Sequence, residues 1–311
     1  MKIINSLSEL SNDFPMGSSL TLGNFDGIHL GHQSLLQRTV TEAKARQIPS
    51  VVVTYFPNPA VVLGKRENFK YLSSQSIKTQ LIESFQIDYL IELPFTESLS
   101  KMSAEAFLED IIIGQLHAKY IVIGYNHFFG SNRRGDYQLL KDNANKYSYD
   151  VELQEAVSLE GEKISSSYIR KKIESGDLRT ANELLGRTFF LEGRIMEGQK
   201  RGRTIQYPTA NLEIPTDVIL PAIGVYACYT HVQGKKFPSM VNVGLNPTFD
   251  GQTIHIESHI FDFSGDIYGE TMQIHFVEKI RDEKKFDGID ALRGQLALDE
   301  KNSREILSRS N

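Results

Sequence analysis

The sequence predicts two domains, an α/β domain on a doubly wound parallel sheet followed by a small antiparallel β-barrel with a terminal helix. In the first half of the chain, apolar runs rich in β-branched residues alternate with helical stretches, which is typical of an open parallel sheet covered on both faces. After Leu185 the segments become short and strand-like, separated by glycine, proline and aspartate, as in a small barrel. The length of 311 residues is ample for two domains.

The elements of the first half follow from hydrophobic periodicity. Strands are expected over residues 19–23, 50–56, 89–93 and 120–124. Helices are expected over residues 31–46, 76–85 and 104–116. Because ligands of such sheets bind beyond the carboxyl ends of the strands, the loops after Gly23, Phe56 and Gly124 are the first places to look for a site.

In the second half, five short segments have strand character, and residues 287–308 return to helical periodicity. We expect this last helix to pack on the barrel. The change in character near Leu185 places the domain boundary between residues 184 and 185, giving domains 1–184 and 185–311. No repeat or low-complexity tract interrupts either half.

Composition narrows the class of protein. Hydrophobic residues make up 40% of the chain and charged residues 23%, as in ordinary globular proteins. The net charge of −5 argues against a nucleic-acid partner and leaves small phosphorylated molecules as candidates. Cys228 is the only cysteine, which excludes an intramolecular disulfide. With no secretory-type N-terminus and no apolar run of about 20 residues, we expect a cytoplasmic protein without a membrane partner. A weak homo-oligomer is left open.

The segment GNFDGIHLGH, residues 23–32, is the first candidate site. It places His29 and His32 three residues apart where a strand turns into a helix. The glycines permit close approach of a ligand, and the first turn of the helix offers N–H groups and the positive end of its dipole. The imidazoles would then stabilise charge on a triphosphate. The alternative is that His32 only caps or packs the start of the helix.

Two further segments fit a phosphate ligand. In ISSSYIR, residues 164–170, serine hydroxyls and N–H groups would bind phosphate while Arg170 neutralises it, and the alternative is a serine N-cap with an exposed arginine. The loop after the fourth strand, residues 124–130, carries Asn126 between aromatic residues. Phe128 and Phe129, taken singly, are better read as core.

The barrel half carries a second candidate site. Gly198 and Gly202 bracket a basic turn that Arg203 continues, which on its own is typical of a solvated hairpin tip. Thr209 and Asn211 lie two residues apart, so on extended backbone they project from one face. Their hydroxyl and amide oxygens suit a magnesium ion that keeps several waters.

Downstream, His255, Glu257 and His259 alternate on one face of a strand. Three interpretations stay open: a His-Glu-His metal face, an exposed polar face, or Glu257 as a general base that takes a proton from a substrate hydroxyl. The general base is the interpretation we favour.

These motifs resemble known families. H-x-G-H and the ISSSYIR segment are similar to motifs of the nucleotidylyltransferase superfamily, and residues 124–130 look like the G-x-(D/N)-F-x-F-G segment that helps hold adenine and flavin. The barrel motifs P-T-A-N, N-x-G-x-x-P-T and D-F-x-x-x-x-Y-G resemble riboflavin kinase, with Arg281 and Phe286 at family positions. From about residue 18 to 308 the chain resembles the bacterial bifunctional riboflavin kinase/FMN adenylyltransferase, or FAD synthetase, family.

The resemblance implies two reactions that use ATP and Mg²⁺. The barrel would phosphorylate riboflavin to FMN, and the N-terminal domain, nucleotidylyltransferase-like, would adenylylate FMN to FAD. The implied catalytic residues are His29, His32, Arg170 and Glu257. The implied substrate-binding residues are Gly23, Phe25, Asp26, Gly31, Asn58, Asn126, Ser165, Ser166, Gly198, Gly202, Arg203, Thr209, Asn211 and Arg281, with Thr209 and Asn211 also on the metal.

Four departures from the family pattern bear on these expectations. Asn58 replaces the histidine of a P-H-P segment and cannot carry a charge, and His127 replaces a phenylalanine; both concern the adenylyltransferase. Gln206 replaces a glycine, and Leu245-Asn246 replaces a Thr-Arg pair; these concern the kinase. A chain with only one of the two activities, or a flavin-binding regulatory protein, is the alternative.

Overall fold

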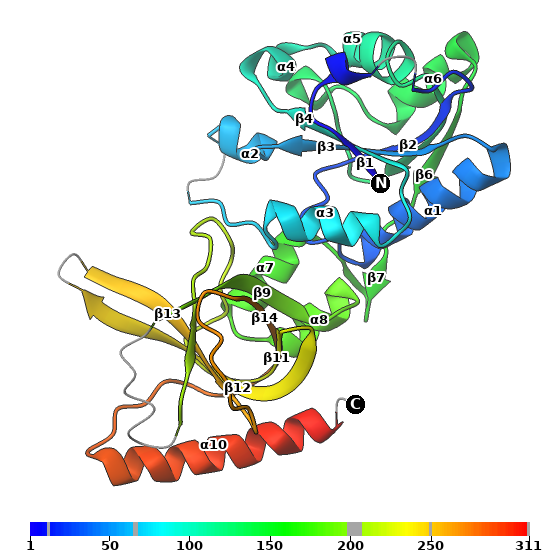
Figure 1. Cartoon of the computed structure of the whole chain (residues 1–311). Helices are drawn as coiled ribbons and strands as arrows, with labels where there is room; N and C mark the ends of the chain where they lie inside the picture. The colour runs from blue at the N-terminus through cyan, green and yellow to red at the C-terminus, as the bar shows by residue number, and fades with distance from the viewer. Residues whose placement is uncertain (11–12, 65–67, 198–206, 249–250, 310–311) are drawn as a thin grey trace. The chain divides into compact units, whose positions relative to one another are not determined.

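A computed structural model describes residues 1–10, 13–64, 68–197, 207–248 and 251–309 of the chain (Figure 1). The chain forms two compact units, Met1–Ser165 and Ser166–Asn311. This division falls ahead of two helices that the expected boundary at 184/185 would assign to the first domain, and the 184/185 boundary itself stays a prediction.

The first unit is built on a six-stranded parallel sheet with strand order β1-β4-β3-β2-β5-β6. Its strands are β1 (Lys2–Ile4), β2 (Ser18–Leu22), β3 (Ser50–Phe56), β4 (Tyr89–Pro94), β5 (Ala118–Gly124) and β6 (Asp150–Gln154). β3 is buried along all but its last residue, as its run of β-branched side chains predicts. All four expected strands are present within two residues of their expected bounds.

Helices cover both faces of this sheet, which confirms the doubly wound architecture. The longer helical segments are α1 (Leu30–Arg46), α3 (Gln75–Glu83), α6 (Tyr137–Tyr147) and the π-helical η2 (Phe107–Ile113). Shorter ones are η1 (Leu7–Glu9), α2 (Pro59–Val62), α4 (Glu97–Lys101), α5 (Ala104–Ala106) and η3 (Ser131–Arg133), and a small hairpin pairs β7 (Ser158–Leu159) with β8 (Glu162–Lys163).

Along β3, successive side chains point into two different hydrophobic cores, one on each face of the sheet. Val52 belongs to the core under α1 and α3, whereas Val51 and Val53 belong to the core under η2 and α6. This alternation is the two-residue period of a strand buried on both faces. The helix expected over 104–116 is α5 continuing into the π-helical turns of η2.

The second unit contains a closed barrel with strand order β10-β13-β12-β11-β14-β9, antiparallel throughout, as predicted. Its strands are β9 (Phe189–Met196), β10 (Ala210–Leu212), β11 (Gly224–Val232), β12 (Lys235–Thr248), β13 (Gly251–Ile260) and β14 (Thr271–Arg281). The terminal helix α10 (Ile289–Arg309) packs on β11, β12 and β14, and the hydroxyl of Tyr229 donates to the carbonyl of Leu307 at 3.0 Å.

Two helices, α7 (Ser166–Glu174) and α8 (Leu178–Leu185), precede the barrel and pack on each other. α8 also lies against β9 and β14, and the amide of Asn182 donates to the carbonyl of Phe276 at 2.9 Å. These contacts explain why the compact unit begins before the barrel sequence itself.

Candidate functional sites

The histidine pair sits at the start of α1, directly after β2 and its following loop. His29 is the N-cap residue of α1, and its Nδ1 accepts a hydrogen bond from the backbone N–H of His32 at 3.3 Å. The two imidazoles stack with ring centroids 3.7 Å apart. The capping role that the sequence left to His32 therefore belongs to His29, and the cap brings both rings to the positive end of a 17-residue helix.

The loop between β2 and α1 is tightly wound. Phe25, Gly27 and Ile28 all have positive φ, and a Cβ on Gly27 would lie 2.6 Å from Leu72. Phe25 is fully buried with its ring edge-on to His32, while Oδ1 of the buried Asp26 accepts from the backbone N–H of Leu72 at 2.9 Å. Phe25 and Asp26 thus shape the loop, and their contact with a ligand stays a prediction.

Two of the predicted glycines are crowded by the aromatic rings beside them. A Cβ on Gly31 would lie 3.3 Å from the imidazole of His29, and one on Gly23 would lie 3.1 Å from the ring of Phe25. Both distances are tighter than ordinary van der Waals contact. The absence of side chains at these positions therefore lets the rings of His29 and Phe25 pack close to the backbone.

The loops that follow β3 and β5 leave the carboxyl end of the parallel sheet, as the histidine loop after β2 does. Asn58 is buried, and its side-chain oxygen caps α2 by accepting from the N–H of Ala60 at 2.9 Å. Asn126 is exposed in the turn after β5, where the N–H of His127 donates to the carbonyl of Gly124. Burial lowers the pKa of His127 to about 4, so its ring is neutral at pH 7.

The serine segment begins a helix, as its pattern predicts: α7 starts at Ser166. Ser165 closes the first unit, and Ser166 and Arg170 belong to the second. The association of these three residues with the histidine pair stays a prediction.

A buried lysine lies beside the histidine loop, and sequence reasoning missed it. Lys78 on α3 is 6% exposed, and its ammonium donates to Oγ1 of Thr54, the fifth residue of β3, at 3.2 Å. Burial lowers its pKa below that of an exposed lysine. In sequence a lysine on an amphipathic helix is an ordinary surface residue, so only the tertiary structure reveals it.

The barrel site is a row of polar side chains across three strands. In the register of the sheet, Asn211 of β10 and Asn242 of β12 lie opposite Glu257 of β13, one on either side. All three are partly exposed, whereas their neighbours in sequence are mostly buried, so they share the face turned away from the barrel core. Thr209 precedes β10 and is also partly exposed.

The two histidines beside Glu257 have separate partners. Nε2 of His255 lies 4.0 Å from Oε1 of Glu257 and 3.5 Å from the amide nitrogen of Asn242, and a Cβ on Gly244 would lie 2.7 Å from the His255 ring. His259 is hydrogen-bonded through Nδ1 to the carbonyl of Pro208 at 2.8 Å, which ties the residue before Thr209 to β13. In the part of the chain that the structure describes, no group of three or more histidine, cysteine, aspartate or glutamate side chains is arranged to hold a metal ion.

Of the remaining residues predicted for the barrel site, the structure describes only Arg281. Arg281 is bound by Asp299 of α10, with Nη2 2.7 Å from Oδ2 and Nε 3.0 Å from both carboxylate oxygens, so the structure gives it a role in holding α10. Gly198, Gly202 and Arg203, together with Gln206, lie outside the described residues.

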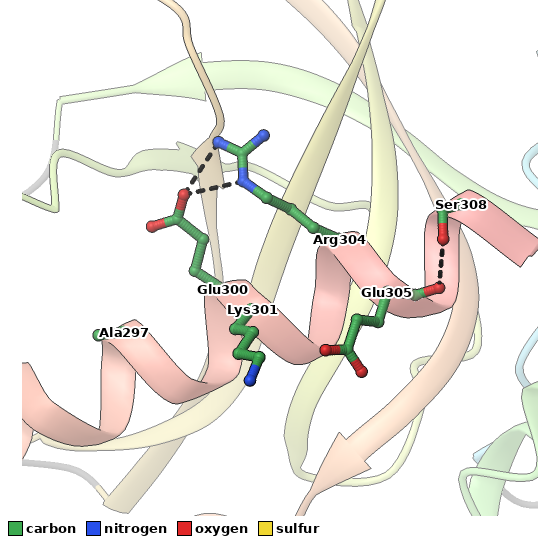
Figure 2. Close-up of a pocket in the computed structure, with 6 residues that line it drawn as sticks. All are labelled: Ala297, Glu300, Lys301, Arg304, Glu305 and Ser308. Carbon is green, nitrogen blue, oxygen red and sulfur yellow. Dashed lines mark hydrogen bonds and ion pairs between the residues drawn. The ribbon is translucent and has the colours of Figure 1, made fainter.

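A surface hollow of about 490 Å³ runs along α10 and is lined by Ala297, Glu300, Lys301, Arg304, Glu305 and Ser308 (Figure 2). Within it, Glu300 and Arg304 form an ion pair one helical turn apart. Its lining includes none of the predicted site residues that the structure describes. No helix among the described residues is both long and apolar enough to cross a bilayer.

Two family models match consecutive parts of the chain. The one described as FAD synthetase matches residues 11–168, and the one described as riboflavin kinase matches residues 185–307.

Curated relatives match over nearly the full length. A bifunctional riboflavin kinase/FMN adenylyltransferase from Listeria monocytogenes is 35% identical over 292 residues, covering 93% of this chain and 92% of that protein. The Escherichia coli K12 protein of the same name is 33% identical over 307 residues and 98% of each chain. A solved structure from Streptococcus pneumoniae, described as a macrolide-efflux protein, is 34% identical with a TM-score of 0.88, covering 97% of this chain and 98% of that one.

Proposed function

Since the chain belongs to the bifunctional riboflavin kinase/FMN adenylyltransferase family, we propose that the two groups of residues described above are its two active sites. The enzyme phosphorylates riboflavin to FMN and adenylylates FMN to FAD. The observation that carries the proposal is that His29 and Glu257 lie in different compact units, so that each reaction has its own residues.

In the first unit, the histidine pair would bind the phosphates of ATP. Nδ1 of His29 accepts from the backbone of His32, so the neutral ring carries its proton on Nε2, which makes that atom a hydrogen-bond donor. A phosphate oxygen of FMN forms the new bond to the α-phosphorus, and the bond from the α-phosphorus to pyrophosphate breaks. The attacking phosphate is already an anion and needs no general base, so positioning, hydrogen bonds from the histidines and charge neutralisation by Arg170 would supply most of the rate.

The same site would include the residues around the histidine loop. We assign Gly23, Phe25, Asp26 and Gly31 to the wall that receives the phosphates, and Asn58, Asn126, Ser165 and Ser166 to contacts with nucleotide or flavin. Support comes from the loop geometry at Gly27 and from the position of Asn58 and Asn126 after the carboxyl ends of β3 and β5.

In the second unit, Glu257 would accept the proton of the ribityl 5′-hydroxyl as that oxygen attacks the γ-phosphorus of ATP. The bond from the γ-phosphorus to the bridging oxygen breaks, and ADP leaves. Asn211, opposite Glu257 in the sheet, offers a neutral oxygen on the same face as the carboxylate, and Thr209, two residues earlier, would offer a second. This donor set fits Mg²⁺, which commonly takes few protein ligands and completes its shell with waters and phosphates. When bound, the ion neutralises charge on the transferred phosphoryl group. Gly198, Gly202, Arg203 and Arg281 complete the proposed kinase site.

We also infer the setting in which the enzyme acts. Its partners would be riboflavin, FMN and ATP, and the cytoplasm would be its compartment. Support comes from the net charge of −5, which disfavours nucleic acid, and from the single cysteine.

A product assay on the purified protein tests the proposed function. One reaction contains riboflavin and Mg-ATP, a parallel one contains FMN and Mg-ATP, and chromatography separates riboflavin, FMN and FAD. FAD is expected from both. FMN without FAD would show that the changes at Asn58 and His127 disable the first site. FAD formed only in the reaction that contains FMN would show that the chain has no riboflavin kinase activity. Flavin binding with no product in either reaction would leave only a regulatory binding protein.

A further inference from the structure

Lys78 lies at a buried position, where a charged side chain loses its favourable interaction with water. It lies on α3 with its side chain turned into the unit, and its neighbour Ile77 is also buried. A lysine on an amphipathic helix ordinarily extends its ammonium to water. Here the ammonium reaches the face of the sheet that carries Val52 and Thr54, next to the carboxyl end of β3.

The ammonium is linked to the histidine loop by two hydrogen bonds. Nζ of Lys78 donates to Oγ1 of Thr54 at 3.2 Å, and the Thr54 hydroxyl donates to the backbone carbonyl of Asn24 at 3.2 Å. Thr54 is completely buried, so water does not compete for its hydroxyl. A buried cation is thus connected to the segment that leads from β2 to His29.

Two carboxylates face the ammonium from the elements packed around it. Asp26 belongs to the histidine loop, and Glu92 lies opposite Thr54 in the pairing of β3 with β4. Both raise the pKa of Lys78, although desolvation outweighs them and the net effect is a lowered pKa. Each carboxylate also has another donor: the Leu72 N–H binds Asp26, and the amide of Gln75 binds Glu92.

An entirely structural role would be filled more cheaply by an apolar side chain of similar length, because a buried charge carries a desolvation cost that a methionine avoids. The cation is instead retained beside the loop that ends at the phosphate-binding helix. We propose that Lys78 is a positioning residue for adenylyl transfer, which holds the Asn24–Asp26 segment through Thr54 and adds positive charge behind the ATP phosphates. This inference rests on the proposed role of His29 and His32.

The test compares Lys78→Met, Lys78→Arg and Thr54→Val with the wild type in FMN-to-FAD turnover. Lys78→Met is expected to lower kcat at least tenfold and to change KM for FMN much less, because the residue acts on the loop and not on flavin. Lys78→Arg should restore most of the rate, since it keeps the charge. Thr54→Val, which keeps the shape of the side chain and removes its hydroxyl, should lower kcat in the same direction as Lys78→Met.

The pH profile separates a positioning role from a packing role. Burial lowers the pKa of Lys78, so the charge at this position is lost at a lower pH than for an exposed lysine. Adenylylation by the wild type should fall as pH rises toward the lowered pKa of Lys78, and Lys78→Arg should move that fall to higher pH, because a guanidinium keeps its proton. Equal alkaline limbs in the wild type and Lys78→Arg would overturn the proposal.

Two controls keep the outcome unambiguous. Lys101→Met removes an exposed lysine of α4 from the same unit and should leave both activities unchanged. Riboflavin phosphorylation, measured in every variant, should also be unchanged. Full adenylylation by Lys78→Met would overturn the inference, and so would a loss that Lys78→Arg does not restore together with a lower melting temperature. If His29→Ala retains adenylylation, the proposed site itself fails, which is a result distinct from either of these.

Discussion

At the residue scale, His29 has two roles that substitution can separate. Its Nδ1 caps α1, and its ring is proposed to bind phosphate. His29→Ala should cost about 1 kcal/mol of stability because it removes the cap, whereas His29→Asn should cost only a few tenths, since asparagine is a good N-cap residue. Both should lower FMN adenylylation by about a hundredfold, as expected for the loss of a donor to developing charge.

Urea unfolding and FAD formation, measured on both variants, check this prediction. Wild-type adenylylation by His29→Asn would mean that the histidine serves the helix alone. Riboflavin phosphorylation, which uses residues of the other unit, is the internal control.

His127 gives the first unit a pH-dependent stability. Its pKa is about 4 in the folded chain, mainly through burial with Arg133 adding to the effect, and about 6.5 in the unfolded chain. Between these values the unfolded state binds a proton that the folded state does not, so the free energy of unfolding decreases as pH falls from 6.5 to 4. His127→Phe removes this contribution and should flatten the fall.

Hydrogen exchange of β5 amides at pH 7.5 and pH 5 would measure this effect in the first unit. The wild type should lose more protection at pH 5 than His127→Phe does. An identical loss in both proteins would show that His127 does not control it. The burial that lowers the pKa of His275 to about 4 belongs to the second unit and is unaffected by the substitution.

At the element scale, α10 is held to the barrel by an ion pair. The Asp299 carboxylate is fully buried and binds Arg281 of β14 through three short contacts. Asp299→Ala would leave the guanidinium without its carboxylate, at a cost of about 3–5 kcal/mol. We therefore expect riboflavin phosphorylation to be lost on heating well before FMN adenylylation.

Glu305→Ala is the matched control, because this exposed glutamate lies on the same helix (Figure 2) and such surface changes usually shift stability by under about 0.5 kcal/mol. Activity measured after brief heating at a series of temperatures gives the comparison. If the kinase activity of both variants resists heat equally, the Arg281–Asp299 ion pair is not the principal attachment of α10.

Most elements could be predicted from hydrophobic periodicity, and the elements that could not are those whose sequence has no clear apolar pattern. β1 has three residues, too few to show an alternation, and β6 is an edge strand without a fully buried residue. Neither has the apolar run that identified β3. α6 was also missed: it has a single fully buried side chain, Leu140, and therefore little apolar signal.

At the scale of the whole molecule, the sequence predicts which loops carry chemistry better than it predicts what individual side chains contact. The histidine motif lies at a helix N-terminus, as local spacing indicated, whereas the position of Glu257 opposite Asn211 is set by the register of the barrel strands. Partners distant in sequence were not predictable: Arg281 binds a carboxylate 18 residues away, and Lys78 contacts Thr54 24 residues earlier. Such contacts depend on tertiary packing, which a single sequence does not specify.

The central claim is that one chain carries two independent active sites, and the most direct measurement is a pair of single substitutions assayed for both reactions. Glu257→Ala should abolish formation of FMN from riboflavin and leave FMN-to-FAD conversion intact. His29→Ala should do the reverse, lowering FAD formation about a hundredfold so that FMN accumulates from riboflavin. Loss of both activities from either substitution, in a protein that remains folded, would contradict the account.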